Sequence, residues 1–406
     1  MNAISPLHAT SCAPRDAAAV REAVLAILPE IAARAGATEA DRRVPEENVA
    51  LLRETGFFRL VQPRAFGGLE GEFADLVDLA IDVGSACTST GWVCGLGAAH
   101  QWLVATFPLQ AQHDVWDADP DTIVCGSYAP SGTVVPVEGG FRASGRWMFA
   151  SGCDVSGWSV CGALLPPAEE GGKPTAAFLL VPRSDYAIDD TWNPVGMAGT
   201  GSKTLVLDGA FVPGYRVLPF KDACAGTTPG AALYDNPLYR LPLLSSIASC
   251  LAAAAVGAAQ GALNSYLAVT SKRVTRGAVA GANNRMAEFP TIQLRVTEAA
   301  ASVDAARTIL LRDISATEDA VRTQGLATVE QRITSRRGQA FSVMLAVRAA
   351  EALNASTGGQ GLDMANPVQR AWRDANAVGR HISMNWDAVG TMYGQMALGL
   401  EPKGQY

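Results

Sequence analysis

The sequence predicts a mainly α-helical protein with a β-domain in the middle of the chain. From residue 17 to about residue 116, apolar residues recur at three- and four-residue steps, which is the helical period. Between residues 120 and 213, short β-rich runs bounded by Gly and Pro follow one another. After residue 241 the helical period returns in long Ala-rich segments. We expect an N-terminal helical domain (1–118), a β-barrel domain (119–228) and a C-terminal four-helix bundle (229–406).

Composition narrows the class of protein. The 406 residues are 49% hydrophobic and 17% charged, which suits a globular chain with a large core. With 39 acidic against 32 basic residues and no Lys/Arg cluster, we expect no nucleic-acid partner. Eight cysteines without framework spacing and four histidines predict a reduced, metal-free, cytoplasmic protein.

No membrane partner is expected either. The first residues contain no basic segment followed by an apolar one, so no secretory signal is visible. The most apolar window, 247–263, is mostly Ala and Gly with a Gln inside it. Such a helix suits close packing on other helices better than a bilayer, which needs roughly 20 strongly apolar residues.

In the N-terminal part, residues 73–107 read as two packed helices. They meet at a segment of small residues, 85–92, where backbones can approach closely. His100 falls near the end of the second helix. A histidine there is open to a plain surface or capping role.

The middle part predicts an antiparallel barrel or sandwich. Its expected strands are 122–127, 132–137, 140–143, 159–165, 176–181 and 203–206. The GTGSKT run at 199–204 is not a phosphate-binding loop, because Ser202 separates Gly201 from Lys203 and the run lies between strands. No Gly-x-Gly-x-x-Gly follows a strand, so we expect the reducing equivalents to come from another protein.

The C-terminal part predicts an up-and-down bundle. Its four expected helices are 242–273, 291–313, 328–353 and 368–397. Before the fourth lies a glycine cluster at 358–361, which lets backbone N–H groups approach a ligand. Pro367 then marks a helix start, and His381 follows at the far end. A glycine platform and a titratable group thus share one short segment.

The run GGQGL…NPVQRAWRDA, residues 358–375, resembles the C-terminal signature of the acyl-CoA dehydrogenase superfamily. In the fatty-acyl dehydrogenases a Glu after the Arg-Asp pair abstracts the α-proton. Residues 379–383 here read Gly-Arg-His-Ile-Ser, so His381 stands near the place of the missing carboxylate. This exchange, with Trp386-Asp387 and Tyr393-Gly394 downstream, is similar to the group D flavin-dependent monooxygenases, the oxygenase components of two-component aromatic hydroxylases.

The resemblance implies an enzyme and its partners. We expect a reduced-flavin-dependent monooxygenase that takes reduced FMN or FAD as a diffusible cofactor and adds O2 to it as a C4a-hydroperoxide. The expected substrate is a phenolic or indole-type aromatic. A separate NAD(P)H-dependent flavin reductase is expected to supply the electrons. The resemblance also implies a homotetramer, in which the glycine turn and the flavin belong to different subunits.

Loops of the β-domain resemble flavin-contacting loops of the family. The turn 127–132 begins with Ser127, and the turn 145–152 places Ser151 near flavin N5. The loop 196–202 carries Thr200 and Ser202, with Ala198 where dehydrogenases have Arg. The resemblance also implies cofactor contacts in the C-terminal bundle, namely Arg273, Arg276, Ser356, Gly358 and Gly359. Both arginines are equally open to being solvated helix-end cations.

The resemblance implies roles at the reacting centre. His381 is the expected base, since a neutral His with a pKa near the working pH suits removal of a phenol proton. Ser151 is expected to hold N5, while Ser127 and His100 hold the substrate oxygen. Trp102, with two further aromatic residues, Trp147 and Phe149, is expected to wall the ring site. The open alternatives are a turn serine, a helix-end histidine and core aromatics.

Three other functions stay open. An acyl-CoA dehydrogenase is disfavoured by the absent carboxylate around His381. Oxygen transfer to nitrogen or sulfur is compatible with the same scaffold. A non-catalytic helical assembly protein that kept the fold is the third.

Overall fold

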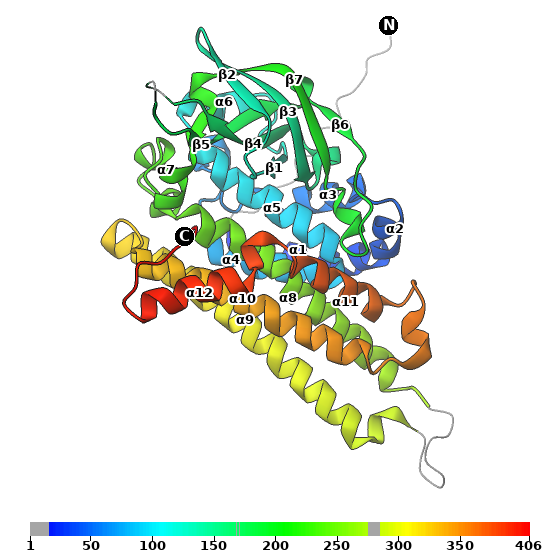
Figure 1. Cartoon of the computed structure of the whole chain (residues 1–406). Helices are drawn as coiled ribbons and strands as arrows, with labels where there is room; N and C mark the ends of the chain where they lie inside the picture. The colour runs from blue at the N-terminus through cyan, green and yellow to red at the C-terminus, as the bar shows by residue number, and fades with distance from the viewer. Residues whose placement is uncertain (1–15, 168, 170, 275–284) are drawn as a thin grey trace, which may run out of the picture.

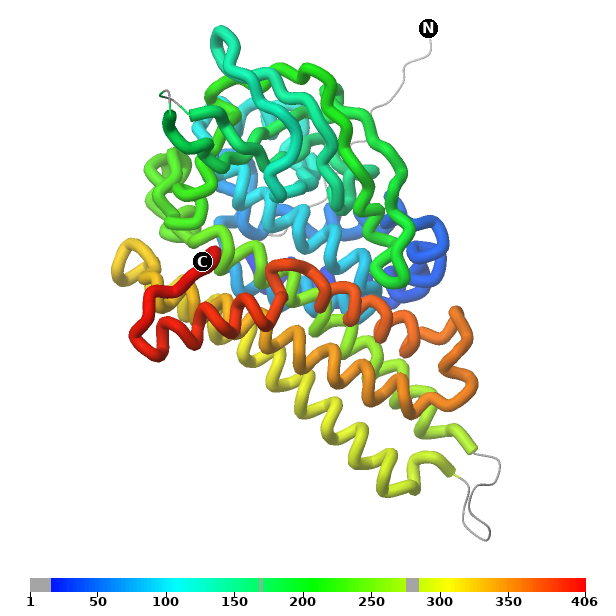
Figure 2. Tube along the Cα trace, viewed as in Figure 1, coloured from blue at the N-terminus to red at the C-terminus, as the bar shows by residue number. Residues whose placement is uncertain are grey.

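The computed structural model describes residues 16–167, 169, 171–274 and 285–406. The β-domain lies against one side of the helical part, and the C-terminal helices run along the opposite side (Figure 1). Figure 2 shows the long C-terminal helices lying side by side and extending away from the β-domain. The predicted fold class, helical domains around a middle β-domain, is confirmed.

The N-terminal helices centre on α5, which is buried along almost its whole length. Gly91 on α5 meets Gly84 on α4 so closely that a Cβ on Gly91 would lie 2.5 Å from the Gly84 Cα. The predicted close approach at this joint is therefore confirmed. The helices are α1 Ala17–Ala33, α2 Ala35–Ala40, α3 Glu46–Glu54, η1 Phe57–Arg59, η2 Arg64–Phe66, α4 Phe73–Ala86, α5 Thr88–Ala105 and α6 Leu109–Trp116.

The middle domain consists of two four-stranded sheets, ordered β1-β4-β5-β8 and β2-β3-β7-β6. Its strands are β1 Val124–Ser127, β2 Thr133–Val137, β3 Gly140–Ala150, β4 Trp158–Leu165, β5 Thr175–Pro182, β6 Ala187–Asp189, β7 Lys203–Pro213 and β8 Val217–Pro219. Trp147, Leu179 and Leu205 are fully buried in the core of this domain. The expectation of a wholly antiparallel domain was wrong at one edge, where β1 runs parallel to β4. After β1 the chain crosses to the other sheet for β2 and β3 and then returns, so β4 follows the direction of β1.

The C-terminal part contains one more break than predicted, because residues 368–397 form two helices. The chain turns at Gly379, after which His381 has extended backbone (ψ 137°) and the Asn385 side chain caps the next helix. The helices are α7 Phe220–Ala225, α8 Leu243–Thr270, α9 Pro290–Gln324, α10 Val329–Asn354, α11 Pro367–Val378 and α12 Trp386–Ala397. The remaining short turns are η3 Cys153–Val155, η4 Arg183–Asp185, η5 Ala198–Thr200, η6 Gly214–Arg216, η7 Gly230–Ala232, η8 Pro237–Arg240, η9 Met286–Glu288, η10 Gly358–Leu362 and η11 Ile382–Met384.

Helix α8 joins the two helical regions into one hydrophobic core. A Cβ on Gly257 would lie 2.6 Å from the Ile81 carbonyl oxygen of α4, and one on Gly261 would lie 2.4 Å from the Ser85 carbonyl oxygen. Among the described residues α8 is the one helix with the length and composition of a membrane span, and 94% of its most apolar window is buried inside the protein. Its apolar character therefore matches its place as the central core helix.

A buried carboxylate connects the bundle to the β-domain. Asp374 on α11 accepts a hydrogen bond of 2.6 Å from the backbone N–H of Met197, whose φ is +59°. The neighbouring Arg373 donates to the Val195 carbonyl (2.8 Å) and forms an ion pair with Glu39 of α2. Three parts of the chain therefore meet at α11.

Burial raises the pKa of Asp374 to about 6, against the opposing effect of the Met197 N–H. Because this pKa lies above the ordinary value of 3.8, folding favours the protonated form. The corresponding contribution to stability is present below about pH 4 and is lost as the pH rises through about 6.

We expect Asp374→Ala to lower the Tm more than Asp374→Asn does. Alanine leaves the Met197 N–H without its acceptor, at a cost of about 1–3 kcal/mol, whereas asparagine keeps a carbonyl acceptor and removes the buried charge. The Asn variant should also lose the part of the stability change between pH 4 and 6 that comes from this group. Thermal unfolding of both variants across that pH range tests this, and an Ala variant as stable as the Asn variant contradicts it.

Candidate active site

Trp92 of α5 brings two predicted site residues together. Its indole N–H donates to the Ser151 hydroxyl at 2.9 Å. The same indole meets the His381 ring edge to face, with ring centroids 5.7 Å apart. The break between α11 and α12 is what leaves His381 beside α5. Ser151 and His381 are thus neighbours of one tryptophan, although they are distant in sequence.

A chain of hydroxyl groups extends from Ser151 into the β-domain. The Ser151 and Ser202 oxygens lie 2.7 Å apart, and those of Ser202 and Thr200 lie 2.6 Å apart. Thr200 Oγ1 donates to the Met197 carbonyl at 2.8 Å. The structure thus places Ser151, Ser202 and Thr200 in one cluster. The hydroxyls of Thr200 and Ser202 are therefore hydrogen-bonded to other groups of the protein.

The ring of His381 is held in one tautomer. Its Nδ1 accepts a hydrogen bond of 3.1 Å from the Ser383 backbone N–H, so in the neutral ring the proton sits on Nε2. Burial, aided by the positive charge of Arg336, lowers the pKa of His381 to about 4. The ring is therefore neutral at pH 7, with a pKa well below the working range expected from the sequence. In this arrangement Nε2 is a hydrogen-bond donor. For His381 to act as a base, its lone pair on Nδ1 would first have to break the hydrogen bond with the Ser383 N–H.

His100 has the opposite tautomer. Its Nδ1 lies 2.6 Å from the Val124 carbonyl oxygen, which only accepts, so Nδ1 carries the proton. Its Nε2 accepts from the Tyr128 hydroxyl at 2.8 Å. Burial lowers the pKa of His100 to about 4 and raises that of Tyr128, so both groups are neutral. His100 was expected to hold a substrate oxygen, but both of its ring nitrogens are bonded here to groups of the protein.

Ser127 lies between the residues around His100 and those around Ser151. It precedes Tyr128, and its hydroxyl donates to the Met148 carbonyl at 2.6 Å, three residues before Ser151. Phe149 lies two residues before Ser151, with φ +64° at an irregularity of β3; it is 61% exposed, and its ring packs edge to face on Trp192. This exposed aromatic ring is therefore available to a ligand.

Two of the predicted wall residues lie in the protein core. Trp102 is fully buried, donates to the Leu238 carbonyl at 2.8 Å and packs edge to face on Phe73. Trp147 is likewise fully buried and donates to the Gly162 carbonyl at 2.7 Å. Their placement gives no support to a role as walls of the ring site, because each indole is enclosed and its N–H is satisfied.

The remaining predicted cofactor residues form a second cluster at the glycine turn. Arg273 donates to the Thr357 carbonyl at 2.5 Å, and its guanidinium lies 3.2 Å from where a Cβ on Gly358 would stand. Ser356 accepts from Arg295 at 2.8 Å, and Gly359 follows in the same turn. Arg276 lies outside the described residues.

The two clusters lie at opposite ends of α11. The glycine turn precedes this 12-residue helix and His381 follows it. At 1.5 Å per residue the helix is about 18 Å long. One chain therefore presents two separate groups of predicted site residues.

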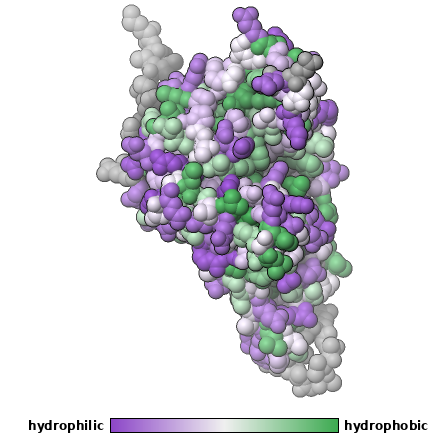
Figure 3. Space-filling model, turned by 60° about the vertical axis from the view of Figure 1, so that its left-hand side comes forward, coloured by the Kyte–Doolittle hydropathy of each residue, from purple (hydrophilic) through white to green (hydrophobic). Residues whose placement is uncertain are grey.

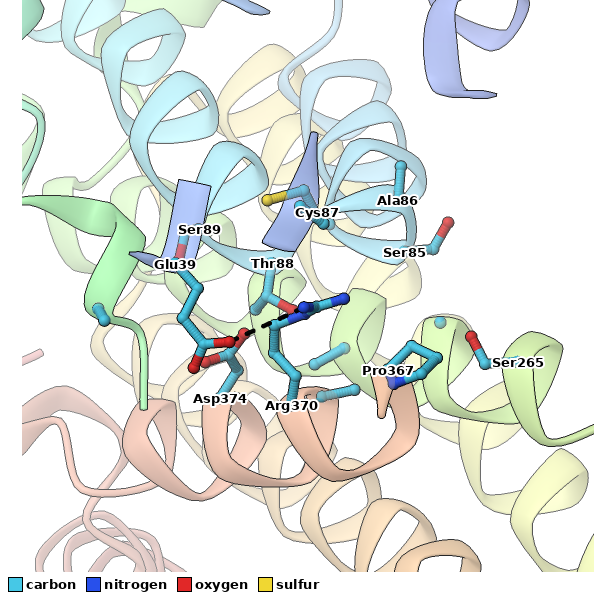
Figure 4. Close-up of a pocket in the computed structure, with 16 residues that line it drawn as sticks. Glu39, Ser85, Ala86, Cys87, Thr88, Ser89, Ser265, Pro367, Arg370 and Asp374 are labelled. Carbon is cyan, nitrogen blue, oxygen red and sulfur yellow. Dashed lines mark ion pairs between the residues drawn. The ribbon is translucent and has the colours of Figure 1, made fainter. Parts of the chain in front are cut away.

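A small cavity lies where α2, α4, α5, α8 and α11 meet (Figure 4). Its lining includes Glu39, Thr88, Arg370 and Asp374, with Arg370 3.8 Å from Glu39. At about 60 Å³ it has room for a few water molecules and not for a flavin. Its lining does not include Ser151, Trp92 or His381.

Sequence reasoning missed three residues of the site, namely Trp92, Tyr128 and Arg336. Arg336 is 4% exposed and donates to the Ser383 carbonyl and to Gln339 Oε1, each at 2.8 Å. Burial lowers its pKa to about 10, and no carboxylate of the described residues forms an ion pair with it. Arg336 adjoins Arg337 in the sequence, and nothing there tells which of the two turns inward. Trp92 ends the small-residue segment 85–92, and Tyr128 follows Ser127 in the turn 127–132. Their places in these two predicted segments were the signal that could have identified them.

The residues present fit a flavin cofactor. Ser151 accepts from the Trp92 N–H and shares one proton with Ser202, so one hydrogen-bonding position of its hydroxyl remains for the ring edge of a ligand. The exposed Phe149, two residues earlier in the chain, offers an aromatic surface. At the other end, Arg273 and the glycine turn combine a positive charge with accessible backbone, which suits phosphate groups.

We expect His381 to titrate near pH 4 and to be the Nε2–H tautomer at pH 7. Its folded pKa lies below the ordinary 6.5, so its contribution to stability is present above about pH 6.5 and is lost as the pH falls toward 4. Nitrogen-15 NMR of histidine-labelled protein, assigned with His381→Asn, measures both properties. A midpoint at or above 6.5, or a proton on Nδ1, contradicts the expectation.

Comparison with known proteins gives consistent matches. Residues 249–386 match the family described as acyl-CoA dehydrogenase, C-terminal domain. The chain is 62% identical over 374 residues to the FADH(2)-dependent resorcinol hydroxylase, oxygenase component, of Rhizobium sp. (strain MTP-10005), covering 91% of each protein. The crystal structure of 3-HSA hydroxylase from Rhodococcus sp. RHA1 matches with a TM-score of 0.90 and 35% identity, over 95% of this chain and 98% of that one.

A further structure, XiaF from Streptomyces sp. in complex with FADH2 and glycerol, matches with a TM-score of 0.86 and 28% identity, covering 96% and 97% of the two chains. The interpretation as a group D monooxygenase is confirmed, and the protein is an oxidoreductase that depends on reduced flavin. On these matches the chain belongs to the oxygenase components of two-component flavin-dependent monooxygenases, built on the acyl-CoA dehydrogenase fold.

Proposed function

We propose that this protein hydroxylates a small dihydroxybenzene of the resorcinol class, with FADH2 and O2 as co-substrates. The observation that carries the proposal is the neutral His381 held beside Ser151 by Trp92, at the place where dehydrogenases have a carboxylate. The 62% identity to a resorcinol hydroxylase supports this substrate class. The bound flavin would supply the oxygen-activating chemistry, and the residues described here would bind and orient the ring and its protons.

The polar groups of the site suit a substrate with two hydroxyls. Trp92 and His100 lie on one helix about two turns apart, roughly 12 Å along its axis. His381 offers a donor at Nε2, and Tyr128, whose proton is given to His100 Nε2, offers its hydroxyl oxygen as an acceptor. All three groups are neutral at pH 7, so the site favours hydroxyl groups over charged substituents.

We further propose that a separate NAD(P)H-dependent flavin reductase delivers the reduced cofactor by diffusion. The relatives are named as oxygenase components, and the sequence contains no Rossmann signature. The proposal takes FADH2 rather than reduced FMN, because the resorcinol hydroxylase is named FADH(2)-dependent and XiaF was solved with FADH2. Transfer of oxygen to carbon, rather than to nitrogen or sulfur, follows from the same relatives.

We propose a homotetramer in which the glycine turn of one copy completes the flavin site of another. The separation of the two residue clusters along α11 supports this arrangement. So do exposed apolar side chains close to each cluster, namely Leu362 and Met364 at the turn and Ile382 beside His381. On the face shown in Figure 3, hydrophobic patches reach the surface between hydrophilic residues. We place the enzyme in the cytoplasm, since its seven described cysteines are all free thiols.

We expect O2 uptake and a hydroxylated product with resorcinol only when FAD, NADH and a flavin reductase are all present. His381→Ala should lower kcat for product formation by about 10²-fold, the usual scale for a lost proton-handling group. His113→Ala is the matched control, because His113 lies on α6 and pairs with Asp117 at the surface. Turnover with NADH alone contradicts the proposed function, and equal effects of the two variants contradict the role of His381.

Complementation tests the proposed assembly. Arg273→Ala and His381→Ala should each have little activity alone, while co-expression should restore about a quarter of the native activity, because random mixing leaves that share of sites with both native residues. Light scattering of the native enzyme should give the mass of four chains. Failure of the mixed oligomer to recover activity, with mixing verified by differently tagged chains, contradicts a shared site.

A further inference from the structure

Gly126 and Tyr128 lie two residues apart at the end of β1, so they share one face of this strand. A Cβ on Gly126 would stand 2.8 Å from Tyr128 Cε1 and 3.1 Å from His100 Cε1. Because His100 belongs to α5, this face of β1 lies against α5 (Figure 1). A side chain at position 126 would therefore displace the tyrosine or the histidine ring.

The side chain of Tyr128 is held in one orientation. Its hydroxyl donates to His100 Nε2 at 2.8 Å, since the proton of the neutral His100 ring is on Nδ1, bonded to the Val124 carbonyl. Its ring packs on that of Phe178, with centroids 4.8 Å apart, and Phe178 packs in turn on Phe220 of α7. The phenol ring is thus fixed between α5 and the sheet that contains β5.

Tyr128 is the residue of this group that a ligand can reach. His100, Ser127 and Phe178 are buried, whereas Tyr128 and Gly126 are each partly exposed. Since a glycine has no side chain, the exposed part of Gly126 is backbone that adjoins the two rings. Accessible space therefore borders the Tyr128 ring, and a ligand in that space meets Tyr128 rather than His100.

We propose that Tyr128 is a specificity-determining residue that limits the substrate to a single small ring without a long substituent. This inference rests on the proposed function, whose substrate class it narrows. The Tyr128 hydroxyl oxygen, with its proton given to His100, accepts from a hydroxyl of the substrate. Resorcinol carries nothing besides its two hydroxyls, whereas an alkyl chain that points toward β1 runs into the fixed tyrosine ring.

The test compares two substrates in the native enzyme, Tyr128→Ala and Tyr128→Phe. Reductase-dependent hydroxylation of resorcinol and of 4-hexylresorcinol gives kcat/KM for each. Alanine removes the ring, so the ratio of kcat/KM for hexylresorcinol to that for resorcinol should rise about tenfold or more. Phenylalanine is the matched control for size. It keeps the ring and removes the oxygen, so it should leave this ratio unchanged while KM for resorcinol rises about tenfold.

Other outcomes decide against the proposal. A ratio unchanged in Tyr128→Ala, including an equal loss on both substrates, means that the ring acts only in folding and overturns it. A native enzyme that uses hexylresorcinol as well as resorcinol does the same. If Tyr128→Ala does not fold, Tyr128→Val also shortens the side chain and must raise the ratio. Tyr186→Phe, in the core of the β-domain, should change neither constant.

The same measurements separate this inference from the proposed function. A native chain that hydroxylates neither compound with the reductase present refutes the proposed function. Native activity on resorcinol, with a substrate ratio that does not respond to the loss of the Tyr128 ring, refutes only the role of Tyr128.

Discussion

The site depends on the hydrogen bond between the buried carboxylate of Asp374 and the backbone N–H of Met197. This bond crosses from the helical bundle to the β-domain and holds a residue with a left-handed backbone in place. The same residue's carbonyl ends the hydroxyl chain that leads to Ser151. A buried carboxylate without a hydrogen-bond donor would destabilise the folded protein. The raised pKa of Asp374 shows that the Met197 N–H offsets only part of this desolvation cost. The protein thus holds a strained turn with a group that is itself partly desolvated.

The interruption between α11 and α12 is the second requirement. A continuous helix would carry His381 along the bundle surface, whereas the break turns its ring onto Trp92 and lets its Nδ1 cap the next turn. The Arg336 guanidinium secures the same turn from α10 through the Ser383 carbonyl. Among the described residues this buried cation has no carboxylate partner, so it raises the cost of protonating the neighbouring imidazole and helps to keep the ring neutral.

The sequence predicted what depends on local pattern and missed what depends on contacts between distant segments. The period of apolar residues located α8 and α10 within a few residues, and the glycines marked the turn before α11. The break at Gly379 escaped because that glycine lies inside an otherwise helical stretch, and an isolated glycine is often tolerated in a helix. Trp102 was misjudged because a tryptophan that lines a pocket and one that fills a core look the same in sequence. Which arginine of the pair at 336–337 turns inward depends on the packing of three helices.

The tautomers of the two histidines also could not be predicted from the sequence. Burial lowers both pKa values to about 4, so neither ring is charged at neutral pH and charge cannot distinguish them. Backbone groups do so instead. The Val124 carbonyl requires a proton on Nδ1 of His100, and the Ser383 N–H requires a lone pair on Nδ1 of His381. The ring of His100 therefore presents an acceptor and that of His381 a donor. Two identical side chains thus have opposite hydrogen-bonding roles, and the fold rather than the pH determines which is which.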